Sequence, residues 1–287
     1  MTETDVNWTA ITGSTGGIGS EIVKIHAARG DALLMLNRSA KKAEAQRDDL
    51  LSAHPGLTIK LITVNLMDRR NISNAIKEIN ELPGRIDILY NNSGILTAQK
   101  VLSPQGLESQ FEVHAVAPYQ LIKGLRSKMA RGADDTPAMV VNFSSSAISP
   151  LKVLELDNLS NPDKVGGLMS TYAQTKLAAT AMAPAMSDAL AVDNILIRAI
   201  DPGATKSAMT TGGNDAMPTV IAWLAPLLFR PADKQAAKVV SAAAPDAFGG
   251  RTGIYVANLK EKKLPAPAQD PDTQRALIAL LDGLTEG

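Results

Sequence analysis

Tyr172 and Lys176 are the two side chains whose types and spacing most clearly suggest chemistry. Four residues apart on a helix, they would lie on the same face, one turn from each other. A phenol has a pKa of about 10 and transfers protons poorly at neutral pH unless a nearby cation stabilises the phenolate. Lys176 would be such a cation, so the pair could act as an acid–base catalyst. An isolated pair of this kind also occurs on exposed helix surfaces, and the rest of the sequence has to decide between the two interpretations.

A glycine-rich turn near the N-terminus could bind a phosphate group. A short apolar stretch, residues 8–11, ends in Thr12-Gly-Ser-Thr-Gly-Gly-Ile-Gly19, and a helical pattern follows. Glycine permits a tight turn and a close approach of the backbone to a ligand, and the N-terminus of a helix attracts anions. We therefore expect Gly13, Gly17 and Gly19 to shape a pyrophosphate site. The alternative is an ordinary glycine-rich turn, because such patterns are weak by themselves.

The second predicted strand, residues 32–36, ends in Asn37 and Arg38, and no carboxylate occurs from residue 32 to residue 43. In dinucleotide-binding folds a carboxylate at this point binds the ribose hydroxyls of NAD, whereas an arginine accommodates the 2′-phosphate of NADP. Arg38 therefore favours NADP, and a solvated basic start of a helix is the alternative. The side chains expected to assist Arg38 are Ser14, Lys41 and Lys42.

Apolar strand-like stretches alternate with helical ones about six times, without a break in composition or an internal repeat. This pattern predicts an α/β fold, a Rossmann-type doubly wound parallel sheet with helices on both faces, in a single domain over residues 1–287. Ligands of such sheets bind beyond the carboxyl ends of the strands, where Asn91, Ser145 and Pro202 are expected to meet the glycine turn. The predicted strands are residues 8–11, 32–36, 57–66, 86–90, 137–143, 194–200 and 253–257.

Helices are expected between these strands, and two irregular segments are expected over the site. Asp68 is predicted to cap one helix, and Pro118 and Pro184 are predicted to kink two others. Residues 147–169 are interpreted as an active-site insertion and residues 204–230 as a substrate lid. The expected helices cover residues 41–50, 68–80, 103–129, 171–190, 232–244 and 272–282.

The composition excludes several classes of function. Without cysteine, the chain has no disulfide, thiol nucleophile or thiolate metal site, and no metal is expected. Its formal net charge of +0 gives no sign of a nucleic-acid footprint or a polybasic membrane patch. The first residues lack the pattern of a signal peptide, and the longest apolar run, residues 219–229, is broken by Pro226 and too short to span a bilayer. We therefore expect a cytoplasmic protein.

With these motifs together, the sequence resembles the short-chain dehydrogenase/reductase family over nearly its whole length. Each motif is modest alone, but all of them occur in the family's order. The motifs are Thr12-Gly-x-x-x-Gly-x-Gly19, Asn91-Asn-Ser-Gly94, Ser144-Ser145, Tyr172-x-x-x-Lys176 and Pro202-Gly203.

The resemblance implies a role for each of these residues. Ser145 would orient a substrate carbonyl and stabilise the developing alkoxide, Tyr172 would transfer the proton, and Lys176 would lower the pKa of Tyr172 and bind the nicotinamide ribose. Positioned donors of this kind stabilise negative charge more in the transition state than in the ground state. The residues expected to bind the cofactor are Gly13, Ser14, Gly17, Ile18, Gly19, Asn37, Arg38, Asn65, Leu66, Asn91, Ser93, Gly94, Tyr172, Lys176, Pro202 and Gly203.

Three features depart from the usual family pattern. His114 stands where an active-site Asn is usual; an imidazole could relay a proton, or it could serve only in packing. Asn65 and Leu66 stand where an Asp often meets the adenine amino group, and an Asn carbonyl can accept the same hydrogen bond. The separation of 27 residues between Ser145 and Tyr172 is longer than in compact members.

This longer separation is similar to that of the retinol dehydrogenase-like branch, which often acts on lipophilic carbonyls or alcohols. We therefore expect an NADP(H)-dependent oxidoreductase that acts on a small to medium lipophilic carbonyl or alcohol. The resemblance also implies a homo-oligomer that pairs through the helices near 107–129 and 171–190. Two alternatives are a cofactor-binding regulatory or scaffold protein with little turnover, and a redox-neutral epimerase or dehydratase. Residues that could line an apolar pocket, or pack in the core instead, are Leu151, Val153, Leu154, Met209, Met217, Trp223, Leu227 and Phe229.

Overall fold

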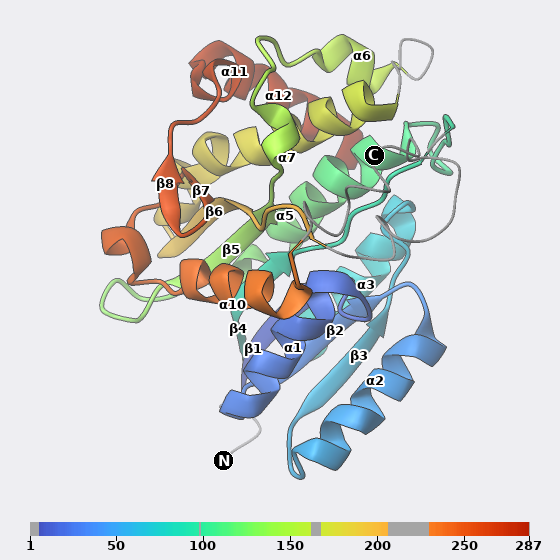
Figure 1. Cartoon of the computed structure of the whole chain (residues 1–287), viewed down its shortest axis with the longest axis vertical. Helices are drawn as coiled ribbons and strands as arrows, with labels where there is room; N and C mark the ends of the chain where they lie inside the picture. Colours follow the sequence, from blue (N-terminus) through green and yellow to red (C-terminus); the bar gives the residue numbers. More distant parts are fainter. Residues whose placement is uncertain (1–5, 98, 162–167, 206–229, 287) are drawn as a thin grey trace.

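An eight-stranded sheet runs through the centre of the structure in the order β3-β2-β1-β4-β5-β6-β7-β8 (Figure 1). The computed structural model describes residues 6–97, 99–161, 168–205 and 230–286. The pairs from β1 to β7 are parallel, and β8 is an antiparallel edge strand that the sequence did not predict. The order of the strands confirms the predicted doubly wound sheet, and its switch point lies between β1 and β4. The strands are β1 Asn7–Thr12, β2 Ala32–Asn37, β3 Ile59–Thr63, β4 Arg85–Asn91, β5 Ala138–Phe143, β6 Ile195–Asp201, β7 Ile254–Ala257 and β8 Lys260–Lys262.

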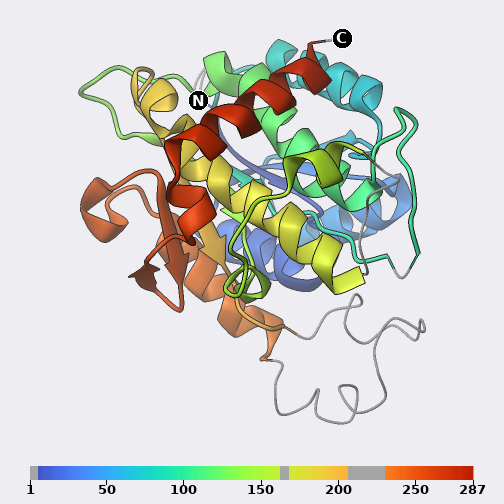
Figure 2. The ribbon, with the colours of Figure 1, turned by 90° about the horizontal axis from the view of Figure 1, so that it is seen from above.

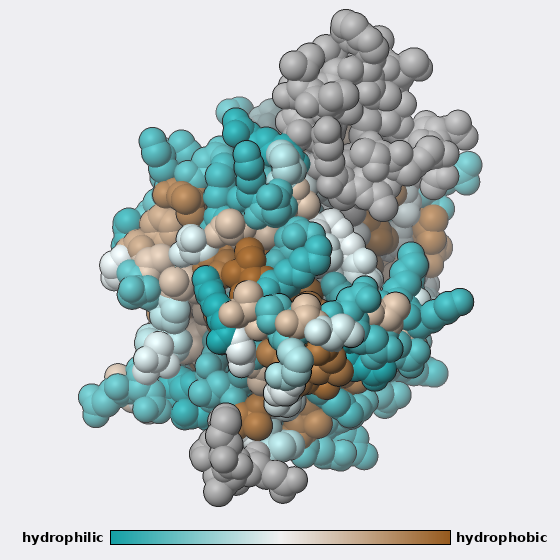
Figure 3. All heavy atoms as spheres, turned by 60° about the horizontal axis from the view of Figure 1, so that its bottom comes forward, coloured by the Kyte–Doolittle hydropathy of each residue, from teal (hydrophilic) through white to brown (hydrophobic). Residues whose placement is uncertain are grey.

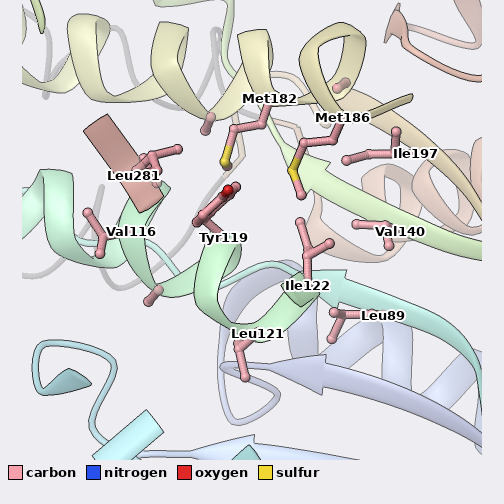
Figure 4. Close-up of a cluster of buried hydrophobic side chains, with 14 of the residues drawn as sticks. Leu89, Val116, Tyr119, Leu121, Ile122, Val140, Met182, Met186, Ile197 and Leu281 are labelled. Atoms are coloured by element: carbon pink, nitrogen blue, oxygen red, sulfur yellow. The ribbon is translucent and has the colours of Figure 1, made fainter. Parts of the chain in front are cut away.

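Helices cover both faces of the sheet, and each face has its own hydrophobic core. On one face pack α1 (Gly17–Arg29), α2 (Ala40–Ala53) and α10 (Ala232–Ala243). On the other pack α3 (Arg69–Glu81), α5 (Ala117–Met129) and α7 (Leu168–Ala191). Figure 4 shows this second core, where Ile122 of α5 and Met182 and Met186 of α7 lie over Val140 and Ile197 of the sheet. Strands buried on both faces explain the continuous apolar runs in the sequence.

The segment from residue 103 to residue 129 is less regular than predicted. Helix α4 is confined to Ser109–Phe111, and a π-helical turn, Glu112–Val116, follows before α5 begins. The backbone is right-handed helical at each junction, so residues 109–129 form one helical segment that contains a π-helical turn. Pro118 lies two residues beyond that turn, and the kink expected there stays a prediction. π-Helical turns are frequent at functional sites.

Other boundaries differ by a few residues. The side chain of Asp68 accepts a hydrogen bond from the Arg70 N–H, which confirms it as the cap of α3. Helix α7 begins at Leu168, ahead of Thr171, and Pro184 lies inside it. The stretch expected as an irregular insertion contains a short 3-10 helix, Ser146–Ile148, and α6, Leu156–Ser160. Residues 162–167 of this insertion and residues 206–229 of the expected lid lie outside the described residues.

The C-terminal helix α12 (Pro271–Thr285) lies across the outer side of α7 and α5, as Figure 2 shows from above. Its Leu277 and Leu281 are buried in the core, and its Asp282 accepts a 2.7 Å hydrogen bond from the Tyr119 hydroxyl of α5. A short helix, α11 (Ala266–Gln269), precedes it and also contacts α7. Part of the helix surface considered for pairing between subunits is thus covered by this chain itself. The homo-oligomer stays a prediction.

The outer surface is mixed in character. Hydrophilic side chains cover much of the face shown in Figure 3, and hydrophobic ones form separate groups between them. Among the described residues, no helix is long and apolar enough to cross a membrane.

The glycine turn between β1 and α1 is held against the end of β4. The Asn92 side-chain amide donates to the carbonyls of Thr12 (2.8 Å) and Gly13 (3.1 Å), and the Thr12 hydroxyl accepts the N–H groups of Asn92 and Ser93. A Cβ atom on Gly19 would lie 2.4 Å from the Gly13 carbonyl oxygen and 2.6 Å from Asn92 Nδ2. Only glycine fits at position 19, because the clashing atoms include backbone that cannot move aside.

Arg198 is a fully buried arginine on β6 that the sequence did not single out. Its guanidinium donates to five backbone carbonyls at 2.7–3.0 Å, those of Ala242, Ala244, Pro245, Ala247 and Arg251. These hydrogen bonds join the end of α10 to the loop that leads into β7. Burial lowers the pKa of Arg198 to about 10, which still leaves it charged at neutral pH.

We predict that Gly19→Ala destabilises the fold by roughly 3 kcal/mol, since the new methyl group overlaps backbone atoms. Urea unfolding measures the change. Gly16→Ala is the matched control, because a Cβ at Gly16 meets no atom within 4 Å; its cost should stay below about 1 kcal/mol. Equal losses for the two variants would contradict the tight contact.

We also predict that Arg198→Met lowers the free energy of unfolding by on the order of 3 kcal/mol or more, because it leaves buried carbonyls without their charged donor. The control is Arg275→Met, since Arg275 forms an exposed ion pair with Asp272 on α12. Such pairs contribute less than about 1 kcal/mol. A small loss for Arg198→Met would show that the loop finds other donors.

Candidate active site

Helix α7 places Tyr172 and Lys176 against the carboxyl end of β5, where Lys176 is buried. Only 5% of Lys176 is exposed, and its ammonium donates a 2.9 Å hydrogen bond to the carbonyl of Phe143, the last residue of β5. This burial rules out the interpretation of the pair as an exposed helix surface. It also lowers the pKa of Lys176 to about 8, although the nearby Asp201 carboxylate partly offsets the effect.

Ser145 brings a second hydroxyl to Tyr172. It lies two residues beyond the end of β5, its side chain accepts the Ala147 N–H at 3.3 Å, and its hydroxyl acts on the Tyr172 phenol. Burial raises the pKa of Tyr172 above its usual value, Ser145 lowers it, and Asp201 raises it further. The net direction is opposite to the lowering expected from Lys176, because burial of the phenol outweighs the favourable contacts.

His114 lies on the π-helical turn, with its ring edge-on to Tyr172 at 5.5 Å between ring centres. Its Nε2 accepts the Ile95 N–H at 3.0 Å, and its Nδ1 lies 2.9 Å from the Thr175 hydroxyl. Because the Thr175 hydroxyl donates to the Tyr172 carbonyl, Nδ1 must carry the proton that joins it to Thr175.

His114 is therefore a neutral ring with both nitrogens engaged. Burial, together with the charge of Lys176, holds its pKa well below the usual value. The ring links α7 to the loop after β4, and its role as a proton relay stays a prediction.

The loop after β4 also approaches these side chains. A Cβ on Gly94 would lie 3.3 Å from His114 Nε2 and 3.8 Å from Lys176 Nζ, and a Cβ on Gly13 would lie 2.6 Å from Ser93 Oγ. Asn91, buried at the end of β4, donates to Asn142 Oδ1 at 2.9 Å. The structure thus brings this predicted motif to both the glycine turn and the Tyr172–Lys176 pair.

Arg38 lies at the end of β2 with its side chain exposed and without a hydrogen bond or ion pair among the described residues. Ser39 beside it caps α2 by accepting the Lys42 N–H. Ser14, in contrast, is buried: its hydroxyl accepts from Asn37 Nδ2 at 2.8 Å and donates to Gln46 Oε1 at 3.0 Å. Arg38 is available to a ligand, whereas Ser14 and Asn37 support the turn behind it.

The expected adenine contacts have roles of their own in the structure. Asn65 Oδ1 accepts the Met67 N–H at 3.2 Å, and the Leu66 side chain is buried in the hydrophobic core. A carbonyl oxygen can accept a second hydrogen bond, so Asn65 keeps the capacity expected of it. The adenine contacts of Asn65 and Leu66 stay predictions.

Beyond β6, the chain turns at Pro202 and Gly203. Gly203 has a φ of 80°, and a Cβ there would lie 2.5 Å from Gln235 Nε2, so this turn requires glycine. Asp201 ends β6 with a buried side chain that accepts the Gly203 N–H at 2.8 Å. Asp201, Asn92 and Thr175 were not predicted as site residues, although all three stand inside or next to the quoted motifs.

These residues suit a nicotinamide nucleotide. No side chain caps the N-terminus of α1 and no acidic residue lies in its first turn, so its N–H groups are available to a phosphate. Gly13 and Gly19 let the backbone approach closely at the same point. Asn37 Oδ1 and Asn91 Oδ1, at the ends of β2 and β4, are buried acceptors that find no hydrogen-bond partner in the described part of the chain, and a bound polar ligand would supply one.

Comparison with known proteins agrees with this geometry. The sequence model of a family described as short chain dehydrogenase matches residues 7–153. Short-chain dehydrogenase TIC 32 A, chloroplastic, from Brassica napus is 29% identical over 199 residues, which cover 67% of this chain and 62% of that protein. Retinol dehydrogenase 13 from Homo sapiens is 26% identical over 274 residues, covering 94% of this chain and 81% of that one.

The fold is shared with solved structures. A blue fluorescent protein from a metagenomic library, solved in complex with NADPH, superposes with a TM-score of 0.68 at 22% identity, covering 89% of this chain and 97% of that one. The resemblance to the retinol dehydrogenase-like branch is confirmed, whereas the cytoplasmic location stays a prediction because TIC 32 A is named as chloroplastic. The family model matches more than half of the chain, and Ser145, Tyr172 and Lys176 lie together at the carboxyl end of β5. The chain belongs to the short-chain dehydrogenase/reductase family of oxidoreductases.

Proposed function

We propose that this protein transfers a hydride between NADP(H) and the carbonyl or alcohol group of a small to medium lipophilic substrate. The observation that carries the proposal is the position of the Ser145 hydroxyl, which acts on the Tyr172 phenol, one helical turn from the buried ammonium of Lys176. A substrate oxygen between the two hydroxyls would receive two hydrogen bonds. The nicotinamide, when bound, supplies or accepts the hydride.

Each side chain then has one task in the reduction. Ser145 donates a hydrogen bond to the substrate oxygen, where negative charge develops. Tyr172 gives its proton to that oxygen, and its raised pKa suits this task because the phenol stays protonated at neutral pH. Lys176 provides the positive charge that stabilises the phenolate left behind. In the oxidation direction the same residues act in reverse.

The preference for NADP rests on Arg38. It is exposed and unpaired among the described residues, and no carboxylate stands at the end of β2 to bind the ribose hydroxyls. A guanidinium can bind a 2′-phosphate through two hydrogen bonds. The blue fluorescent protein that shares this fold was solved with NADPH, which supports the proposal without deciding it.

The proposal of a lipophilic substrate has more limited support. Val153 in the insertion and Met169, one helical turn before Tyr172, are 59% and 58% exposed. Leu154, by contrast, is buried in the core, and Leu151 packs against it. The predicted pocket residues of the lid, from Met209 to Phe229, lie outside the described residues. The most extensive match among the named relatives is a retinol dehydrogenase.

We predict that Tyr172→Phe lowers kcat by about 10²- to 10⁴-fold, the usual contribution of a positioned proton donor. NADPH binding, measured by its fluorescence, should stay nearly unchanged because Phe keeps the ring. Thr171→Ser, a neighbouring change outside the proposed chemistry, is the control. A Tyr172→Phe enzyme with full activity on a panel of ketones, aldehydes, quinones and alcohols would overturn the mechanism. NADPH binding by the wild type without turnover on the same panel would favour a regulatory or scaffold protein.

We predict that Arg38→Asp weakens NADPH binding on the order of 10- to 100-fold, because a charge-assisted contact is lost and a repulsive charge introduced. NADH binding should weaken less or improve, since a carboxylate can accept from the ribose hydroxyls. Isothermal titration with both nucleotides measures the ratio. Arg275→Asp on α12 tests for a general effect of charge. A wild-type preference for NADH would contradict the assignment.

A further inference from the structure

A buried carboxylate, Asp201, lies beside the Tyr172–Lys176 pair and has no part in the proposed chemistry. Only 9% of the residue is exposed. Burial raises the pKa of its carboxyl, and the Gly203 N–H, the Tyr255 hydroxyl and the Lys176 ammonium oppose that rise. One oxygen accepts the Gly203 N–H at 2.8 Å, and the other accepts the Tyr255 hydroxyl of β7 at 3.4 Å. A buried charge is costly unless donors and an opposite charge stabilise it, so its position requires an explanation.

The register of the sheet brings this carboxylate next to Lys176. Phe143 of β5 pairs with Ile200 of β6, and the Ser144 N–H donates to the Ile200 carbonyl at 2.9 Å. Lys176 is bonded to the Phe143 carbonyl, and Asp201 follows Ile200. The ammonium and the carboxylate therefore end neighbouring strands inside the same buried region, where charges interact more strongly than in water.

A chain of hydroxyls joins the two groups from behind. The Tyr255 hydroxyl that donates to Asp201 is also influenced by the Ser144 hydroxyl, which lowers the pKa of Tyr255 against the larger effect of its burial. Ser144 Oγ lies 2.7 Å from Thr180 Oγ1, and Thr180 donates to the backbone carbonyl of Lys176 at 2.7 Å. These contacts hold Asp201 in place relative to α7 without neutralising it.

We propose that Asp201 is a positioning residue for the reaction proposed above: its buried negative charge keeps Lys176 as an ammonium and Tyr172 as a neutral phenol, the state that donates a proton. Among the described residues, Lys176 is the cation that acts on Asp201, and Tyr255 donates to it as a neutral hydroxyl. Gln235 of α10, against Gly203, carries no charge, and His114, whose ring lies against Tyr172, is neutral.

The direction of the effect follows from charge. A negative charge favours the ammonium over the amine and the phenol over the phenolate, so it raises the pKa of both Lys176 and Tyr172. Reduction requires both groups protonated; it is supported below their apparent pKa and lost as pH rises through it. Removing the charge makes either deprotonation easier. Whichever group loses the first proton, the alkaline limb of the reduction must move to lower pH.

The test is Asp201→Asn, which keeps the shape and the acceptor for the Gly203 N–H but removes the charge. We expect the pH at which kcat/KM for reduction declines on the alkaline side of its profile to fall by about one unit. The pH at which oxidation begins should fall by the same amount. Tyr255→Phe is the matched control, because it breaks the same network but keeps the Asp201 charge. The activity of Tyr255→Phe can fall, but the pH at which its kcat/KM for reduction declines should stay that of the wild type. The proposal would be overturned if this pH were the same in the wild type and Asp201→Asn, or if it shifted equally in both variants.

A second measurement does not depend on turnover. The chain has four tyrosines, and burial raises the pKa of Tyr90, Tyr119 and Tyr255, each to a value beyond the ordinary range. The tyrosinate absorbance step that Tyr172→Phe removes from an alkaline titration belongs to Tyr172. Asp201→Asn should move that step to lower pH, and an unmoved step would refute the inference. If the step moves but no substrate is turned over, the proposed function fails and the role of Asp201 stands.

Discussion

The burial of one ammonium group, that of Lys176, is the constraint on which the rest of the site depends. A charge removed from water is stable only where dipoles and opposite charges replace the solvent. The Phe143 carbonyl accepts its hydrogen bond and Asp201 supplies the opposite charge. The carbonyl and the carboxylate lie at neighbouring positions, at the carboxyl ends of β5 and β6. Helix α7 therefore has to pass over these two strand ends with residue 176 directly above them.

Hydrogen bonds rather than apolar contacts fix the position of α7 at this point. The Thr175–His114 pair ties it to the loop after β4, and the Thr180–Ser144 pair ties it to the end of β5. Apolar packing further along, through Met182 and Met186, holds the helix on the sheet through contacts that are not directional. Directional contacts near Tyr172 remove that freedom, as a site for proton transfer requires.

Much of the fold could be predicted because strands and helices carry their own patterns. The apolar runs at 32–36 and 137–143 became β2 and β5 almost residue for residue, and the cap at Asp68 was correct. The shift from α4 through a π-helical turn to α5 could not be foreseen, because it depends on how Glu112 and His114 are buried. Edge strand β8 is short and fully exposed, and therefore has no apolar pattern to reveal it.

The sequence by itself determined the fold class, the glycine turn and the identity of the Ser145, Tyr172 and Lys176 set, because these depend on residue types at short spacings. Only the tertiary structure decided the electrostatics. It showed that burial raises the pKa of Tyr172, that His114 is a neutral link between two elements, and that the Asp201 carboxylate raises the pKa of Lys176 against the effect of burial. These properties depend on distances between residues far apart in the chain and on the exclusion of water, and neither quantity is encoded in any local stretch of sequence.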